Sequence, residues 1–291
     1  MSTKAIAQPA PYAESYVEVN GLKLRMQDYG TAGKPALLCL HGGAANAHWY
    51  DFVAQGFTAD YHVRAVDLRG HGDSQWDPSP TPSYGYQQHA ADVNALVEKL
   101  DLRDFVLIGH SMGGMIGSIY CATYGTDGAY PSRVKAFMLV DTTIKFTPER
   151  IAGFNAISNR PGRHYATQEE FIAAYKVHPG GSTAAPEIHR HIAKCSSRQF
   201  EDGRWRHKVD RKVYNNREMV DSFPLWNKIK IPVLLMKGER SQRIDPVTVA
   251  DVKSRAPQVE VDEVPNCDHH ITLDNPAGFV TVARRFLDKI R

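Results

Sequence analysis

Ser111 has the clearest chemical setting in the sequence, because it lies at the centre of the pentapeptide Gly-His-Ser-Met-Gly at residues 109–113. The apolar run 105–108 before it is typical of a buried strand, and residues 112–124 after it are typical of a helix. A serine on a sharp strand-to-helix turn holds its hydroxyl above the sheet, and N–H groups at the helix start can stabilise an oxyanion. We therefore predict that Ser111 is a nucleophile; the alternative is a serine that merely caps the helix.

A serine hydroxyl needs a base to become nucleophilic at neutral pH, and the pKa of histidine suits that role. The sequence contains 13 histidines, so position must decide between them. His269 follows the last predicted strand, residues 259–264, and precedes the last predicted helix, residues 276–290. The order of Ser111 before His269 also fits a serine on a strand-to-helix turn. His269 is the predicted base, and its neighbour His270 is the alternative.

The elements that would hold these residues alternate along the chain. Residues 16–29 read as an antiparallel hairpin in which Asn20 and Gly21 supply the turn. Helical patterns, such as residues 87–100, separate several continuous apolar runs. Such runs are typical of strands buried on both faces of a parallel sheet, and they occur at residues 36–40, 62–66, 105–108, 134–140 and 232–236. The alternation indicates an α/β fold with a mainly parallel sheet covered on both faces.

Residues 145–225 break this alternation, because they contain no strong buried strand. Patches at 169–177 and 186–200 read as short helices. An insertion of this size between two strands predicts a helical cap over the carboxyl edge of the sheet, where ligands bind in open α/β folds. The predicted organisation is a core of residues 14–144 and 226–291 with a cap formed by residues 145–225.

Three further motifs accompany the serine pentapeptide: Leu-His-Gly-Gly at 40–43, Asp-Leu-Arg-Gly-His-Gly-Asp-Ser at 67–74, and Asn-Cys-Asp-His-His at 266–270. On these motifs the chain resembles, from about Val17 to Leu287, the capped α/β-hydrolases of the epoxide-hydrolase and C–C-hydrolase type. The resemblance implies a mostly parallel eight-stranded sheet with helices on both faces, a helical cap and hydrolase activity. The motifs are specific to the superfamily and do not identify a substrate.

The resemblance also implies roles for two loops and one histidine. The backbone N–H of Gly43 would pair with that of Met112 to hold an oxyanion, whereas the alternative for His-Gly-Gly is an ordinary tight turn. The family pattern Pro-x-x-Gly-His corresponds to Pro-Asn-Cys-Asp-His here and favours His269 over His270. The loop at 67–74 carries groups that could do chemistry, but in the family it is mainly structural.

The sequence departs from the family at the acid that normally orients the histidine. Ser241 and Gln242 stand where most members place an aspartate, and neither can carry a negative charge. Asp141, at the end of an adjacent predicted strand, is the favoured replacement, since some haloalkane dehalogenases of this fold place their acid there. Asp245 is a second alternative, although Asp-Pro also reads as a helix N-cap, and a site with no acid is the third. Glu239 comes too early in the loop.

Composition argues against several other classes of protein. The chain has 291 residues, of which 42% are hydrophobic and 23% charged, as is typical of a globular protein with a large core. A net charge of +3 does not favour nucleic acid, and no apolar stretch would form a transmembrane helix. The start lacks the apolar region of a secretory signal, and reduced thiols would fit a cytoplasmic protein. We expect no membrane partner. The four cysteines show no metal or redox spacing, and we expect neither a metal nor a cofactor.

The sequence therefore predicts a cofactor-independent serine hydrolase that cleaves an ester, lactone, thioester or activated C–C bond through an acyl-enzyme. One alternative is a lyase of the hydroxynitrile-lyase type, and another is a ligand receptor or degenerate hydrolase weakened by the missing acid. The expected partner is a small molecule. Between Ile188 and Arg217 there are nine Lys or Arg residues and three acids, and this positive charge would suit an anionic small molecule. A homo-oligomer is compatible with the sequence.

Overall fold

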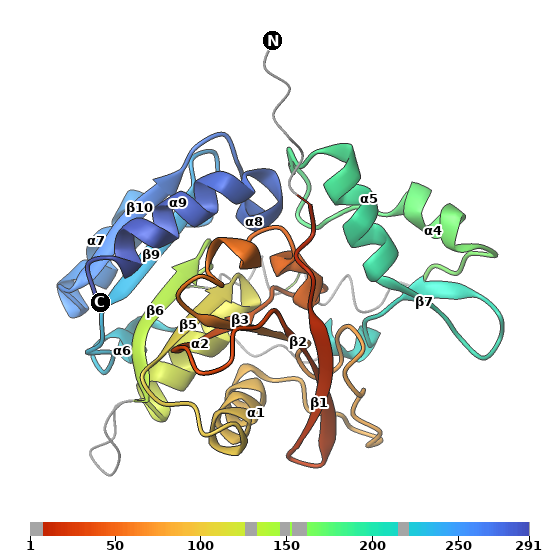
Figure 1. Cartoon of the computed structure of the whole chain (residues 1–291), viewed down its shortest axis with the longest axis horizontal. Helices are drawn as coiled ribbons and strands as arrows, with labels where there is room; N and C mark the ends of the chain where they lie inside the picture. Colours follow the sequence, from red (N-terminus) through yellow and green to blue (C-terminus); the bar gives the residue numbers. More distant parts are fainter. Residues whose placement is uncertain (1–7, 126–132, 146–151, 153–161, 215–220, 291) are drawn as a thin grey trace.

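The computed structural model describes residues 8–125, 133–145, 152, 162–214 and 221–290 (Figure 1). Its central sheet consists of β1 (Ala13–Val19), β2 (Leu22–Asp28), β3 (Ala36–Leu40), β4 (His62–Val66), β5 (Phe105–His110), β6 (Val134–Val140), β9 (Val233–Gly238) and β10 (Val259–Val264). The order across the sheet is β1-β2-β4-β3-β5-β6-β9-β10. The pairs β1–β2 and β2–β4 are antiparallel, and the other neighbours are parallel. The predicted eight-stranded, mostly parallel sheet is confirmed.

The strands β1 and β2 form the predicted hairpin at one edge of the sheet. Their register pairs Val19 with Leu22 across the turn. Asn20 and Gly21 have φ angles of 47° and 75°, the left-handed backbone that a two-residue hairpin turn of this kind requires. The Asn-Gly pair therefore sets the turn as the sequence indicated.

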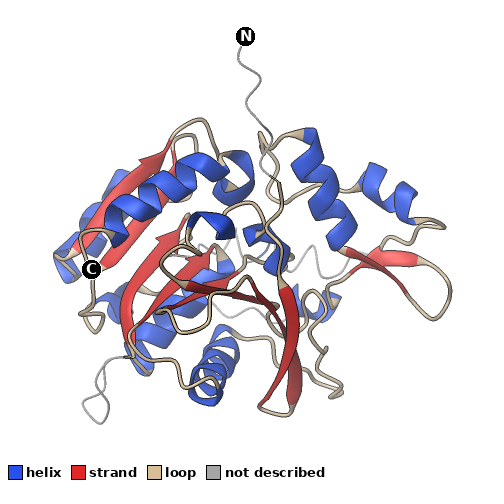
Figure 2. Cartoon of the chain, viewed as in Figure 1, coloured by secondary structure: helices blue, strands red, loops and turns tan. Residues whose placement is uncertain are grey.

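The central strands are apolar because helices cover both faces of the sheet (Figure 2). Adjacent residues of one strand enter different cores: Leu107 faces one and Ile108 faces the other. The first face is covered by α1 (Tyr86–Lys99), α2 (Met112–Thr123), α6 (Phe223–Trp226) and α7 (Pro246–Arg255). The second is covered by α8 (Ile271–Asp274), α9 (Pro276–Leu287) and two 3-10 helices, η1 (Ala47–Tyr50) and η2 (Ala54–Gly56). Among the described residues, no helix combines the length and apolarity needed to cross a bilayer.

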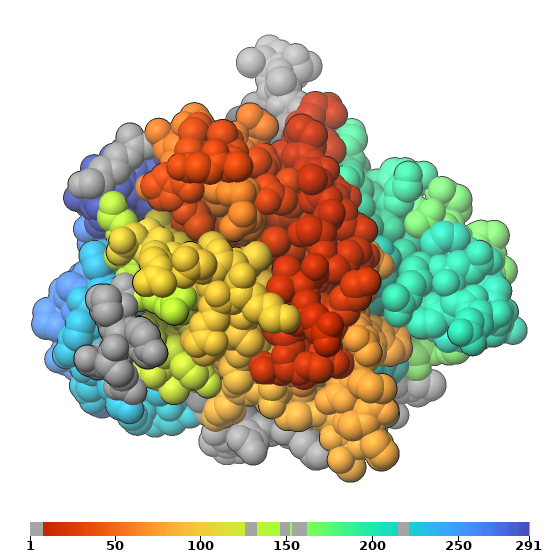
Figure 3. Space-filling model, turned by 60° about the horizontal axis from the view of Figure 1, so that its bottom comes forward, coloured from red at the N-terminus to blue at the C-terminus, as the bar shows by residue number. Residues whose placement is uncertain are grey.

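The segment between β6 and α6 is the insertion. Its described elements are α4 (Gln168–Ala174), α5 (Pro186–Cys195), β7 (Ser197–Gln199), β8 (Trp205–His207) and the 3-10 helix η3 (Arg211–Tyr214). In Figure 3 this segment, coloured green to cyan, lies beside the red N-terminal hairpin. The helix expected over 186–200 ends at Cys195, because residues 197–199 pair with residues 205–207 as an antiparallel ribbon. The insertion is therefore a mixture of helices and a short ribbon.

Candidate active site

Ser111 lies at the turn between β5 and α2, in the strand-to-helix setting that the sequence indicated. Its φ of 53° and ψ of −113° are the strained angles of a nucleophile elbow. A Cβ at Gly109 would lie 2.4 Å from the carbonyl oxygen of Gly113, and a Cβ at Gly113 would lie 2.3 Å from that of Leu40. The turn can therefore form only because glycine occupies both positions.

His269 connects Ser111 to Asp141. Nε2 of His269 lies 3.1 Å from Oγ of Ser111, and Nδ1 lies 2.6 Å from Oδ2 of Asp141. With its proton on Nδ1, the imidazole donates to the carboxylate and accepts from the serine hydroxyl, which is the arrangement of a serine–histidine–aspartate triad. The structure thus brings together the three residues favoured from the sequence. The imidazole of the alternative base, His270, is directed elsewhere and donates from Nε2 to the carbonyl oxygen of Pro179, at 2.9 Å.

Asp141 occupies the end of β6 and is fully buried. Oγ of Ser241 donates to its Oδ2 at 2.7 Å, and the backbone N–H of Gly238 donates to its Oδ1 at 3.4 Å. Burial raises the pKa of Asp141 above its usual value, and the Ser241 and Gly238 hydrogen bonds oppose that rise. Ser241, at the position where most members of the family place an aspartate, therefore acts here as a hydrogen-bond donor to Asp141. This role of Ser241 is not apparent from the sequence, in which Ser241 only marks the place of the missing aspartate.

The other two carboxylates considered for the acid have different partners. Asp245 caps α7 by accepting the N–H of Thr248 at 2.8 Å, which matches its alternative interpretation as an N-cap. Glu239 is exposed and accepts the N–H of Asn266 at 2.7 Å. Among these three carboxylates, Asp141 is the one that contacts His269.

Two further histidines flank His269. The ring of His110 lies 4.8 Å from that of His269, and its Nε2 donates to the backbone oxygen of His269 at 2.9 Å. Burial, with the neighbouring histidines, lowers the pKa of His110 well below its usual value, and burial also lowers the pKa of His270. Both flanking rings are therefore neutral near pH 7, so neither places a positive charge against His269 when it accepts a proton.

The loop after β3 lies against the elbow. A Cβ at Gly42 would lie 3.2 Å from Cβ of Ser111. The neighbouring His41 is buried; its Nδ1 donates to the carbonyl oxygen of Gly42 at 2.7 Å, and its Nε2 accepts the N–H of Leu68 at 3.0 Å. These contacts fix the loop beside Ser111. Gly43 is the next residue of this loop, and its N–H remains the predicted oxyanion donor, together with that of Met112 in the first turn of α2.

Asp67 connects the loop at 67–74 to the start of η1. Its Oδ1 accepts the N–H of Ala47 at 2.7 Å, and its Oδ2 accepts the N–H of Asp73 at 2.9 Å. A Cβ at Gly72 would lie only 2.2 Å from Cγ of Asp67. The carboxylate thus organises backbone N–H groups of two loops, a structural role in agreement with the family pattern.

The buried neutral histidines predict a loss of stability in mild acid. Burial lowers the pKa of both His41 and His110. Because their folded-state pKa lies below the unfolded value of about 6.5, the unfolded chain takes up protons that the folded chain does not. The contribution of these neutral rings to the free energy of unfolding is therefore fully present above about pH 6.5 and is lost as the pH falls. We expect the free energy of unfolding from urea titrations to drop between pH 6.5 and 5.5 by up to about 1 kcal/mol for each such ring.

The matched control for this pH prediction is His110→Gln. This variant removes one titrating ring and should reduce the drop, while the other rings with a lowered pKa, which include His207 and His270, retain the rest. An unfolding free energy that is constant over this pH range in the wild-type protein would contradict the assignment of both rings as buried and neutral.

Comparison with known proteins places these features in a family. A family model for the alpha/beta hydrolase fold matches residues 35–276. The 3-hydroxybutyrate-oligomer hydrolase of Cupriavidus necator is 27% identical over 91% of this chain and 92% of its own length. The N-formylmaleamate deformylase of Pseudomonas putida is 26% identical over 94% of this chain and 95% of its own length.

A solved structure extends the likeness to three dimensions. The crystal structure of E-2-(acetamidomethylene)succinate hydrolase superposes with a TM-score of 0.81 at 21% identity, over 96% of this chain and 100% of that one. At 21% identity the superposition supports the fold alone. The match to the family model supports the class of activity. The chain belongs to the alpha/beta hydrolase fold family and is a hydrolase.

Proposed function

We propose that the protein is a cofactor-independent serine hydrolase that forms an acyl-enzyme on Ser111, with His269 as the general base and Asp141 as the acid that orients it. The observation that carries this proposal is the continuous hydrogen-bonded series Ser111–His269–Asp141, with separations of 3.1 and 2.6 Å. The receptor or degenerate-enzyme alternative depended on the absence of an acid. Because the Asp141 carboxylate contacts His269, that reason no longer supports the alternative.

In the proposed reaction Oγ of Ser111 attacks the carbonyl carbon while its proton passes to Nε2 of His269. The carbonyl oxygen becomes an oxyanion, which the backbone N–H groups of Gly43 and Met112 would hold; each such donor contributes about 10²–10³-fold in rate. Collapse of the tetrahedral intermediate breaks the ester C–O bond, and His269 returns the proton to the leaving alcohol. Water, deprotonated by His269, then attacks the acyl carbon. The bond to Oγ of Ser111 breaks, His269 returns the proton to that oxygen, and the acid leaves.

We propose that the insertion, residues 145–225, forms the cap over this site, with the core formed by residues 14–144 and 226–291. Two backbone contacts support that placement. The carbonyl oxygen of Pro179 accepts from His270, and the N–H of Asp210 donates to the carbonyl oxygen of Gly70 at 2.8 Å. The insertion therefore meets loops at the edge of the sheet that carries the triad.

We further propose that the substrate is a short ester carrying a carboxylate. Relatives are named for a hydroxybutyrate oligomer, a maleamate and a succinate derivative, and the last two names describe carboxylates. Arg243 is a half-buried cation in the loop after β9. Burial raises the pKa of Asp141 and lowers that of His270, and the positive charge of Arg243 lowers both, so this charge lies near the triad.

The basic run in the insertion is a weaker candidate for anion binding. Several of its members already form ion pairs: Arg190 with Glu169, Arg206 with Asp202, and Lys208 with Asp73. These pairs satisfy the charges locally. We propose Arg243 for recognition of the substrate carboxylate because its positive charge acts on both Asp141 and His270.

Arg243→Gln is expected to raise KM for the p-nitrophenyl monoester of succinate about tenfold more than KM for p-nitrophenyl butyrate, with little change in kcat. The reason is the loss of one charge-assisted hydrogen bond, which is worth about 1.5 kcal/mol. The matched control is Arg240→Gln, since Arg240 is an exposed residue of the same loop. Equal effects of Arg243→Gln on the charged and neutral esters would contradict this recognition.

The reaction class is tested by trapping the acyl-enzyme and by following the oxygen of water. Rapid quenching with p-nitrophenyl acetate should leave one acetyl group on the peptide that contains Ser111. Hydrolysis in isotope-labelled water should place one labelled oxygen in the acid product. Products that form without labelled oxygen would indicate a lyase, and tight ligand binding without turnover would indicate a receptor; either result overturns the proposal.

A further inference from the structure

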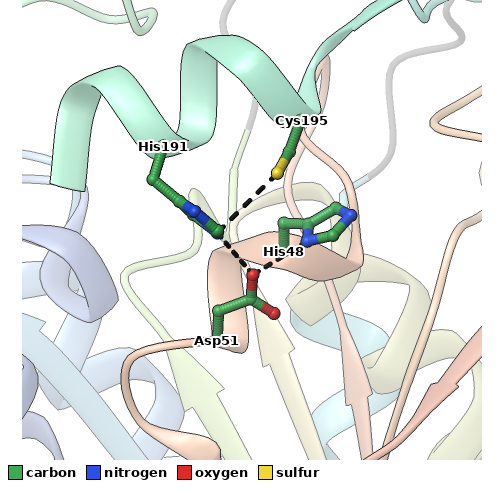
Figure 4. A group of neighbouring side chains, drawn as sticks. All are labelled: His48, Asp51, His191 and Cys195. Carbon is green, nitrogen blue, oxygen red and sulfur yellow. Dashed lines mark hydrogen bonds and ion pairs between the residues drawn. The ribbon is translucent and has the colours of Figure 1, made fainter. Parts of the chain in front are cut away.

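A cluster of four potential metal ligands lies between the insertion and the core, outside the serine–histidine–aspartate site (Figure 4). It consists of His48, Asp51, His191 and Cys195, and one ligand atom of each lies within 4.8 Å of the other three. We propose that this cluster is a zinc site that fastens the insertion to the core.

Local helix geometry explains how the four residues form two converging pairs. His191 and Cys195 are four positions apart on α5, so both side chains leave the same face of the helix. His48 lies in η1, and Asp51, three positions later, is the C-cap of that helix. A 3-10 turn places side chains three positions apart on the same side. Figure 4 shows the pair on α5 pointing toward the pair on η1.

The distances are close to those of a tetrahedral zinc site. Oδ2 of Asp51 lies 2.8 Å from Nδ1 of His48 and 2.6 Å from Nε2 of His191, and that Nε2 lies 3.7 Å from Sγ of Cys195. Zinc bonds of about 2.0–2.3 Å in tetrahedral geometry separate ligand atoms by roughly 3.3–3.8 Å. The sulfur–nitrogen distance already fits, and the carboxylate oxygen would need to move from each imidazole by only about 1 Å.

The donor set suits zinc among the common metal ions. Imidazole nitrogen, thiolate sulfur and carboxylate oxygen are all zinc ligands, whereas calcium and magnesium prefer oxygen alone. One thiolate and one carboxylate would balance the charge of a divalent ion. His48 and Asp51 are buried, while His191 and Cys195 are partly exposed, so an ion can reach the cluster from the solvent side of α5.

Neighbouring side chains bind one oxygen of the Asp51 carboxylate, so the other oxygen, Oδ2, can bind the metal. Oδ1 of Asp51 accepts from the hydroxyl of Tyr29 at 2.7 Å and from Nε2 of Gln27 at 3.4 Å. Such outer contacts orient a metal-binding carboxylate. Nε2 of Gln27 also lies 3.0 Å from Nδ1 of His48, and zinc on that nitrogen would leave this amide with Asp51 alone.

Arg25 is a cation near the cluster, and two carboxylates already pair with it. Nη1 of Arg25 lies 3.5 Å from Nε2 of His48, and a metal on Nδ1 would turn that Nε2 into a donor. Arg25 has two other partners that can take its donors: Glu14 at 2.7 Å and Asp67 at 3.4 Å. Zinc binding would therefore move Arg25 toward these carboxylates without leaving it unpaired.

The position of the site defines its role. The loop at 41–46 leads directly into η1, and Nδ2 of Asn46 at the end of that loop donates to Oγ of Ser196, next to Cys195, at 3.0 Å. A metal bound to both η1 and α5 would hold the same two segments together more strongly. It would fix the insertion and the loop beside Ser111 without taking part in the chemistry.

The test is metal binding by the full chain after treatment with EDTA. Calorimetric titration with zinc chloride should give one equivalent, and cobalt(II) chloride should give the visible bands of a tetrahedral site with a thiolate-to-cobalt charge-transfer band. His191→Gln should weaken zinc binding by more than about 100-fold, beyond the effect of losing an outer contact. At free zinc of about 100 times Kd, the unfolding equilibrium constant of the wild-type protein should fall about 100-fold, with no such fall in His191→Gln.

The matched control is His189→Gln, since His189 lies on the same helix, outside the cluster. It should bind zinc as the wild-type protein does. Cys195→Ser, a conservative change, should retain the far-ultraviolet circular dichroism of the fold and lose the charge-transfer band. Absence of a stoichiometric zinc site in the wild-type chain, or unchanged binding in His191→Gln, overturns the proposal. Neither residue belongs to the triad, so these outcomes are independent of whether Ser111 is the nucleophile.

Discussion

Ester hydrolysis is expected to fall by about 10⁶-fold when Ser111 is replaced by alanine, as for other serine nucleophiles of a triad. The hydroxyl oxygen is the atom that would form the acyl bond, and it lies 3.1 Å from the imidazole nitrogen that would take its proton. Without it, the oxyanion donors can assist only direct attack by water, which retains about 10³–10⁴-fold over the uncatalysed reaction. The measurement is kcat on p-nitrophenyl acetate, with labelling by a fluorophosphonate probe as the second readout.

The matched control for this change is Ser118→Ala. Ser118 is a buried serine of the same helix, and its Oγ donates to the carbonyl oxygen of Gly114 at 2.9 Å. This variant should keep both the kcat of the wild-type protein and its reaction with the probe. A folded Ser111→Ala protein that still hydrolyses the ester would exclude Ser111 as the nucleophile.

Asp141→Asn is expected to lower kcat by about 10⁴-fold with little change in KM. Asparagine keeps the shape of the side chain but removes the charge that would stabilise the imidazolium, and its amide favours the wrong tautomer of His269. The contact at stake is the 2.6 Å hydrogen bond from Nδ1 to Oδ2. The measurement is steady-state kinetics on the same ester, with circular dichroism to verify the fold.

A second substitution makes this prediction sharper. Oγ of Ser241 lies 2.7 Å from Oδ2 of Asp141, so a carboxylate at position 241 would lie close to the same imidazole. Adding Ser241→Asp to Asp141→Asn should restore at least about tenfold of the lost kcat, because it returns a charge to the histidine. Asp245→Asn is the control and should change both kcat and stability little, because asparagine caps a helix about as well as aspartate. A large loss of kcat in Asp245→Asn, with none in Asp141→Asn, would identify a different acid.

Features set by neighbouring residues were predictable from the sequence. The hairpin turn at Asn20 and Gly21 needs only two residues that tolerate positive φ. The elbow at Ser111 needs only an apolar strand, a helix and glycine at positions 109 and 113, where a side chain would not fit. His269 could be located because the loop after the last strand has a recognisable pattern. Each of these signals lies within a few residues of the feature that it predicts.

Features set by contacts between distant residues were not predictable in the same way. The ribbon of β7 and β8 was missed, because its three-residue strands are too short to show an alternating pattern. The proposed zinc site was not predicted, because each helix supplies only two of the four ligands, and His191 and Asp51 are 140 positions apart. Their proximity depends on how α5 packs against η1.

The sequence by itself determined the α/β class, the order of the strands along the chain and the turn that presents Ser111, because short-range patterns encode them. It left three choices for the acid: Asp141, Asp245 or none. Only the tertiary structure decided which carboxylate meets His269. The reason is that β6 lies beside β9 in the sheet, which places Asp141 next to Ser241, 100 positions away in the chain, and under the imidazole.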